Sequence, residues 1–223
     1  MLGLILFSAL SPMKPVIILL LLASSVWFFM FSPISKGLFN FWLLMFIASG
    51  ILAIIGIIYQ RKNLASLFYF RKNHIAAGII SAALLYFIFL AGSLLSVSIF
   101  PFAKAETRAI YALRGQGQLG LVALALFFWI GPAEEIFWRG FVQERISRRF
   151  GKNTGLVLAA LAYAGVHAFA LNLMLFLAAL ICGIFWGMLF RRYRSLWPAI
   201  FFPCHLGCAD ICAIAYSIIC GKI

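Results

Sequence analysis

The chain has 223 residues, of which 65% are hydrophobic, 17% aromatic and only 10% charged. Its mean hydropathy of +1.10 leaves too little polar surface to cover a water-soluble fold. A membrane span needs about 20 apolar residues, so the length accommodates seven or eight spans with short connections. These properties exclude a soluble enzyme, a secreted disulfide scaffold and a nucleic-acid-binding domain.

The chain carries a formal net charge of +13, from 18 Lys and Arg residues against five acidic residues. In a soluble protein such an excess indicates a nucleic-acid partner. Here the basic residues fall in clusters between apolar runs, where they set orientation and contact anionic headgroups. We therefore expect membrane lipid as a partner, and no nucleic acid.

Charged residues and prolines divide the chain into apolar stretches. Lipid offers the backbone no hydrogen-bond partners, and no stretch alternates with period two, so each is predicted to be a helix. The result is an all-α, polytopic transmembrane bundle of about seven spans. The predicted spans are 15–31, 38–60, 75–100, 119–144, 154–170, 172–190 and 196–219. Residues 1–12 would form a short interfacial or re-entrant helix or lengthen the first span, and the bundle as a whole has room for an eighth span.

The basic residues of the connections are divided unevenly between the two sides of the membrane. With a cytoplasmic amino terminus, cytoplasmic connections hold twelve Lys and Arg residues and the other side holds five. The positive-inside rule favours this orientation, and we expect a bacterial inner membrane. The segment 60–74, with Leu and Phe between basic pairs, predicts an amphipathic helix on the cytoplasmic face. Glu106 is expected to be a solvated counter-charge in a loop.

Three charged residues lie inside the fourth predicted span, in the run GPAEEIFWRGFVQER at 131–145. Each charged residue at a helix centre costs about 2.5–3.5 kcal/mol on insertion scales, whereas each Leu, Phe or Val returns about 0.3–0.6 kcal/mol. This face must therefore turn towards protein or a water-filled cavity, where ionisable residues usually have a function. The three residues are Glu134, Glu135 and Arg139.

Helical spacing assigns different roles to the two carboxylates. Glu135 and Arg139 are four residues apart, so they share a helix face and can pair. Glu134 lies about 100° round the helix and is the carboxylate left for chemistry. Gly131 and Pro132 are expected to loosen the helical hydrogen bonds and let water or substrate approach.

Two histidines of later spans lie at the same depth as this carboxylate. Counted from the nearest cytoplasmic boundary, Glu134, His167 and His205 lie roughly 16, 20 and 16 Å into the membrane. A carboxylate and imidazoles that converge in a sheltered cavity suit acid–base activation of water and stabilisation of an oxyanion, without a cofactor. The same three residues could instead ligate a divalent metal such as Zn²⁺. Spacing alone does not separate the two chemistries.

These residues resemble the type II CAAX prenyl protease family, also called CPBP or Abi intramembrane proteases. Its signature is a Glu-Glu-x-x-x-Arg motif, an aromatic-x-x-x-His motif and a further His on a later helix. The corresponding residues here are Glu134, Glu135, Arg139, Tyr163, His167 and His205. The resemblance covers residues 119–215. It implies an intramembrane protease core in 119–223, whereas the apolar and basic pattern predicts N-terminal transmembrane helices with an interfacial segment in 1–118.

The resemblance implies that Glu134 and His167 activate the water and that His205 helps to stabilise the oxyanion. The family usually carries Asn or Asp four residues after the last histidine, where this chain has Ala209 followed by Asp210. A side chain one position further along points about 100° away, so Asp210 reaches the site only through a locally distorted helix. We favour that arrangement, because an unpartnered carboxylate deep in lipid is costly. The candidate catalytic residues are Glu134, His167, His205, Glu135, Arg139 and Asp210.

The predicted function is an intramembrane endopeptidase that hydrolyses a membrane-anchored protein or peptide. The resemblance implies a substrate with a prenylated or otherwise membrane-tethered carboxy-terminal segment. A sorting signal or a peptide pheromone is the alternative substrate. The alternative is a non-enzymatic membrane protein, such as a proton-coupled carrier or an immunity-type interaction protein, using the same polar residues. Carriers usually show repeated halves with broken helices, and this sequence has no internal repeat.

Overall fold

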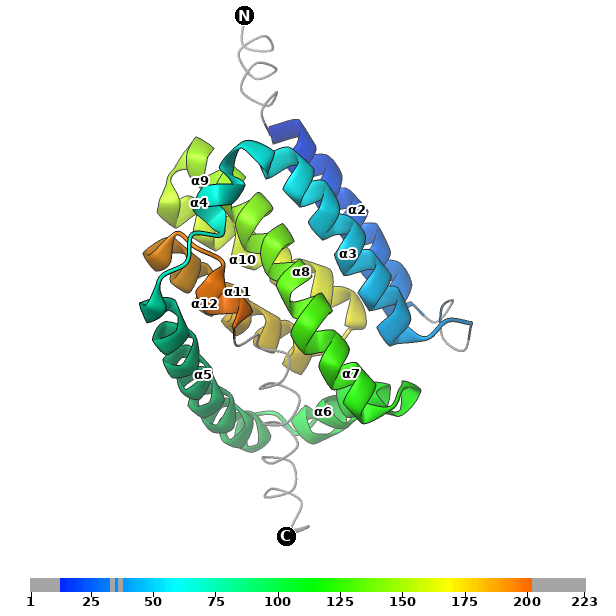
Figure 1. The fold of residues 1–223 in the computed structure, drawn as a ribbon. Helices are drawn as coiled ribbons and strands as arrows, with labels where there is room; N and C mark the ends of the chain where they lie inside the picture. The colour runs from blue at the N-terminus through cyan, green and yellow to red at the C-terminus, as the bar shows by residue number, and fades with distance from the viewer. Residues whose placement is uncertain (1–12, 33–34, 36–37, 202–223) are drawn as a thin grey trace, which may run out of the picture.

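The computed structural model describes residues 13–32, 35 and 38–201, and in this part the chain consists of helices joined by short turns (Figure 1). Six of these helical segments are long and apolar enough to cross a membrane. They are Lys14–Phe31, Phe41–Leu67, Lys72–Ile99, Gly120–Phe150, Lys152–Ala170 and Leu173–Tyr193. The predicted all-α transmembrane bundle is therefore confirmed, together with its first six spans.

The seventh predicted span, 196–219, is described only in its first residues. There α12 (Trp197–Ile200) packs against α5 (Lys72–Ile99) and α11 (Leu173–Tyr193). The rest of that span and residues 1–12 lie outside the described residues.

The first two helices lie side by side along one flank of the bundle (Figure 1). α2 (Lys14–Phe31) carries Pro15 in its first turn, where the missing N–H has no helical partner to lose. α3 (Phe41–Gln60) begins after Asn40, whose side chain accepts hydrogen bonds from two amide groups of the first turn at 2.9 and 3.1 Å. Their own sequences thus determine where both helices begin.

The fourth span is one long helix with two π-helical interruptions. It comprises α7 (Leu119–Ala125), the π-helical turn Leu126–Ile130, α8 (Gly131–Glu135), the π-helical stretch Ile136–Gln143 and α9 (Glu144–Phe150). Pro132 has no N–H, and its ring excludes the carbonyl four residues earlier, so regular α-helical bonding fails there. The loosening expected from Gly131 and Pro132 is therefore present. π-Helical turns often mark functional sites, and two of them flank α8.

α10 (Lys152–His167) and α11 form the most extensive helix pair of the described chain. A Cβ atom on Gly183 of α11 would lie 3.1 Å from the Cα atom of Ala160, so this glycine lets the two backbones approach closely. The chain enters α10 through Gly151, whose φ of +92° is a conformation that favours glycine. The close pairing fixes α10, which carries Tyr163 and His167.

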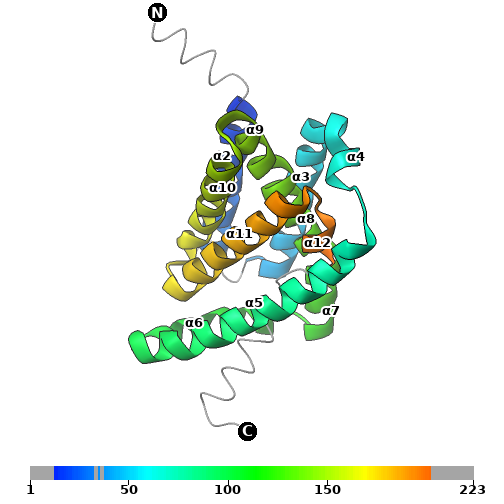
Figure 2. The ribbon, with the colours of Figure 1, turned by 90° about the vertical axis from the view of Figure 1, so that its left-hand side faces the viewer.

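α5 and α6 (Ala103–Ala112) lie along α11 on the side away from α2 (Figure 2). Glu106 therefore belongs to a helix rather than to a loop. Its Oε2 atom accepts a hydrogen bond from the amide of Met174 at 2.9 Å, and its carbonyl accepts one from the side chain of Asn172 at 2.9 Å. The expected loop at Glu106 is therefore wrong, and its carboxylate has a partner distant in sequence, because the amide of Met174 in the first turn of α11 has no acceptor within its own helix.

The segment 60–74 is also not the single amphipathic helix that its sequence predicts. It contains the 3₁₀ turn Arg61–Asn63, α4 (Leu64–Leu67), a non-helical stretch at 68–71 and the first turn of α5. The carbonyl of Phe68 accepts a hydrogen bond from the indole of Trp197 at 2.7 Å, and that of Tyr69 accepts one from the hydroxyl of Ser195 at 2.8 Å. These tertiary partners replace the bonds of a continuous helix.

Candidate active site

Glu134 lies on α8 in the interior of the bundle, where the residue is 2% exposed. The hydroxyl of Tyr163, on α10, donates a hydrogen bond to Oε2 of Glu134 over 3.1 Å. A buried carboxylate requires polar partners, because removing its charge from water is costly. The contact joins α8 to α10 at the carboxylate that the sequence predicts to be catalytic.

His167 is the last residue of α10 and lies one helical turn beyond Tyr163. Its Nδ1 atom lies 2.8 Å from the carbonyl oxygen of Tyr163. A carbonyl oxygen only accepts hydrogen bonds, so Nδ1 is the donor and carries the proton. In the neutral imidazole Nε2 is then the acceptor nitrogen. The helix therefore selects the tautomer that can accept a hydrogen bond from water.

The ion pair expected between Glu135 and Arg139 is present. A guanidinium nitrogen of Arg139 lies 2.9 Å from Oε1 of Glu135, and both side chains are buried. Arg139 also donates to the carbonyl oxygen of Cys182 on α11 at 3.2 Å, and its guanidinium lies 5.0 Å from the centre of the Tyr163 ring. The ion pair thus connects α8 to α10 and α11. It takes no part in the neighbouring hydrogen bond between Glu134 and Tyr163.

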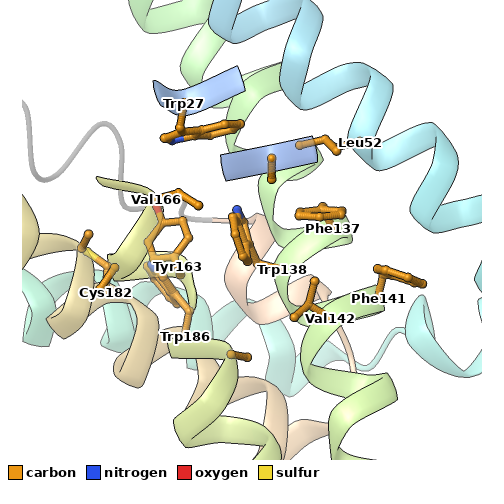
Figure 3. Packing of buried hydrophobic residues seen from close by; sticks show 14 of the residues in the cluster. Trp27, Leu52, Phe137, Trp138, Phe141, Val142, Tyr163, Val166, Cys182 and Trp186 are labelled. Carbon is orange, nitrogen blue, oxygen red and sulfur yellow. The ribbon is translucent and has the colours of Figure 1, made fainter. Parts of the chain in front are cut away.

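Aromatic rings enclose these polar groups. The indole of Trp138 lies between the rings of Tyr163 and Phe137, with ring centres 5.2 and 5.0 Å apart (Figure 3). From the first span, Trp27 and Phe31 approach the imidazole of His167, with ring centres at 6.3 and 6.4 Å. The site is therefore formed in part by a helix far from the protease-like motifs in sequence.

Two of these indoles present buried N–H groups. The Nε1 atoms of Trp27 and Trp138 have no hydrogen-bond partner within the described part of the chain. A water molecule or a ligand can supply the acceptor that such a buried donor needs. Sequence reasoning missed both tryptophans, since nothing separates them from the other aromatic residues of the spans. It also missed the contact of Tyr163 with Glu134, although the aromatic-x-x-x-His motif pointed to that tyrosine.

Two predicted site residues, His205 and Asp210, lie outside the described residues. Of the three candidate metal ligands Glu134, His167 and His205, the structure therefore describes only the first two. Among the residues that the structure describes, no group of three His, Cys, Asp or Glu residues is arranged to hold a metal ion. The roles of His205 and Asp210, and the choice between acid–base and metal chemistry, stay predictions.

Comparison with known proteins identifies the segment that carries this site. Residues 116–207 match the family model of type II CAAX prenyl endopeptidases, Rce1-like. This segment is therefore similar to the Rce1-like type II CAAX prenyl endopeptidases. The matched segment includes α8 and α10, and the six candidate spans support an integral, multi-pass membrane protein. No curated protein and no solved structure matches the chain. α2, which supplies Trp27 and Phe31, lies outside the Rce1-like segment.

Proposed function

We propose that the chain is an intramembrane endopeptidase that cleaves a membrane-anchored protein or peptide with water activated by Glu134 and His167. The hydrogen bond from Tyr163 to Glu134 is the observation that carries the proposal. It joins the carboxylate to α10, and the imidazole follows one helical turn along the same helix. A buried carboxylate and an imidazole that are both held by the same tyrosine suit general base catalysis. The Rce1-like match supports the reaction class.

In the proposed reaction Glu134 takes a proton from a water molecule, and the oxygen of that water attacks the carbonyl carbon of the scissile bond. His167 orients the water through Nε2, since Nδ1 donates to the backbone. The proton then passes from Glu134 to the amine nitrogen as the carbon–nitrogen bond breaks. Glu135 and Arg139 act as positioning residues, because their charges neutralise each other while they join three helices.

The oxyanion formed in this step requires hydrogen-bond donors. We assign this role to His205, assisted by Asp210, as the resemblance implies. The indole N–H groups of Trp27 and Trp138 are further candidates, because both are buried, lack a partner among the described residues and belong to rings that pack against site residues. They would donate to the attacking water or to the substrate carbonyl.

The substrate class that we propose is a carboxy-terminal segment held at the membrane by a prenyl group or another anchor. The Rce1-like match supports this class through the name of the family. A cytoplasmic amino terminus and a bacterial inner membrane belong to the same proposal, and the uneven division of basic residues between the connections supports the orientation.

Substrate trapping tests the proposal. The full chain and its Glu134→Gln variant are expressed in the host membrane and purified, and the retained peptides are identified by mass spectrometry. The variant should retain intact peptides whose cleaved forms appear with the wild-type chain. Gly165→Ala, at an open position of the same helix that carries Tyr163, is the matched control and should behave as wild type. Equal cleavage by the wild-type chain and Glu134→Gln would contradict the assignment.

A further inference from the structure

A basic pocket lies where α3 ends and α9 begins, away from the candidate active site. Its volume is about 330 Å³. Its lining includes Tyr59, Gln60, Arg61, Lys62, Arg145 and Arg148. The 3₁₀ turn after α3 leads directly into α4. Figures 1 and 2 show α4 and α9 at the same end of the bundle. Four cationic side chains from two separate elements therefore share one site.

The described part of the chain supplies almost no negative charge to this pocket. Arg148 pairs with Glu144 at 2.8 Å, and the same carboxylate oxygen accepts a second bond from Arg194 at 2.9 Å. Arg61, Lys62 and Arg145 form no ion pair with any described residue. Like charges that share a pocket repel one another, so a bound anion would stabilise this arrangement.

The pocket is held in place by hydrogen bonds to the neighbouring helices. Arg145 donates to the carbonyl oxygen of Tyr59 at 2.9 Å, and its guanidinium lies 5.8 Å from the ring centres of Tyr59 and Phe141. Gln60 is 2% exposed and donates to the carbonyl oxygen of Gly140 at 2.8 Å. These hydrogen bonds thus hold the end of α3 against the fourth span, so the basic side chains of the pocket start from a well-packed backbone.

An apolar surface leads along α3 to the pocket. Four isoleucines at helical spacing on this helix are 48–59% exposed: Ile47, Ile51, Ile54 and Ile58. In a membrane such a face contacts acyl chains, and the next helical position after Ile58 is the basic pair Arg61 and Lys62. A ligand that fits both surfaces has a negatively charged head and an apolar tail. A free anion would use only the pocket.

We propose that the basic pocket binds the phosphate headgroup of an anionic phospholipid whose acyl chains lie along the isoleucine face of α3. Basic pockets between membrane helices are suited to such headgroups, because each cation attracts the anionic lipid. The bond from Gln60 to Gly140 also connects this pocket to the π-helical stretch that carries Arg139. Bound lipid should therefore stabilise the part of the bundle that holds the ion pair of the active site.

The test uses the full chain purified in detergent. Binding of phosphatidylglycerol and of phosphatidylcholine with the same acyl chains is measured by native mass spectrometry and by the shift of the thermal unfolding midpoint. Phosphatidylglycerol should bind more tightly and raise the midpoint, and Arg61→Gln/Lys62→Gln should weaken its binding about thirtyfold. The affinity should also fall as salt is added.

Arg149→Gln/Lys152→Gln is the matched control, because it removes the same charge from exposed positions outside the pocket. It should leave phosphatidylglycerol binding close to wild type. Equal binding of the two lipids, or equal losses in both double variants, would overturn the proposal. Equal stabilisation by inorganic phosphate would also overturn it, since the ligand would then be a free anion and the isoleucine face would play no part.

Discussion

The hydroxyl of Tyr163 lies 3.1 Å from Oε2 of Glu134 and joins α10 to α8 inside the membrane-spanning bundle. The backbone carbonyl oxygen of the same tyrosine accepts a hydrogen bond from Nδ1 of His167 over 2.8 Å. Tyr163 thus orients both Glu134 and His167, the two residues proposed to activate the water. The geometry of the carboxylate and the tautomer of the imidazole therefore depend on the same turn of α10.

Tyr163→Phe tests this relationship, because it removes the hydroxyl and keeps the ring. A hydrogen bond to a charged group contributes about 1.5–3 kcal/mol, so we expect turnover to fall about ten- to a hundredfold. Glu134→Gln should abolish turnover. Hydrolysis of a membrane-tethered, prenylated reporter peptide is measured at matched amounts of folded protein. Wild-type turnover in Tyr163→Phe would remove the hydroxyl from the mechanism.

Glu135→Gln should affect stability more than chemistry. It leaves Arg139 without its carboxylate in a buried site, and breaking a buried pair costs about 3–5 kcal/mol. We expect a lower yield of folded protein and a lower thermal unfolding midpoint in detergent. The double variant Glu135→Gln/Arg139→Gln should recover part of the loss, because it removes the unpaired charge. An unchanged midpoint in Glu135→Gln would show that the pair does not hold the helices together.

Trp138→Phe tests the buried indole donor beside Tyr163. Phenylalanine keeps most of the ring packing and loses only the N–H group and part of the ring. If this N–H contacts the attacking water or the substrate carbonyl, turnover should fall about 10²- to 10³-fold. Trp186→Phe makes the same change elsewhere in the buried core and should retain most turnover. Similar rates in the two variants would assign both indoles to packing.

Exhaustive chelation distinguishes acid–base catalysis from metal catalysis. If Glu134 is the base, His167 orients the water and His205 donates a hydrogen bond to the oxyanion, the purified protein should keep its activity without metal. Activity is measured before chelation, after chelation and after addition of Zn²⁺. Loss followed by recovery would instead favour water activated by a metal held by these three residues.

Gly155→Ala should open the turn between α9 and α10. An added Cβ atom would lie 2.7 Å from the backbone of Ser147, so the backbone must move. Gly165→Ala is the control on the same helix, since no atom lies within 4 Å of its Cβ position. We expect the first variant to lower the unfolding midpoint and the second to leave it unchanged or raised. Equal midpoints would contradict the tight packing at Gly155.

The sequence by itself determined the features that depend on local pattern. Long apolar runs specify membrane helices, because the backbone must satisfy its own hydrogen bonds in lipid. The pairing of Glu135 with Arg139 follows from a spacing of four residues, which any helix brings together. The irregular bonding around Pro132 follows from its missing N–H. Each of these depends on neighbours within about one helical turn.

Only the tertiary structure decided which distant groups meet. The contact of Tyr163 with Glu134, the approach of Trp27 to His167 and the basic pocket all join separate helices. The same applies to the two local predictions that were wrong. In segment 60–74 a hydrogen bond from Trp197 replaces the bonding of a continuous helix, and Glu106 lies in a helix where Met174 is its partner instead of in a loop. Periodicity fixes which face of a helix is buried, whereas the packing of helices against one another fixes what that face touches.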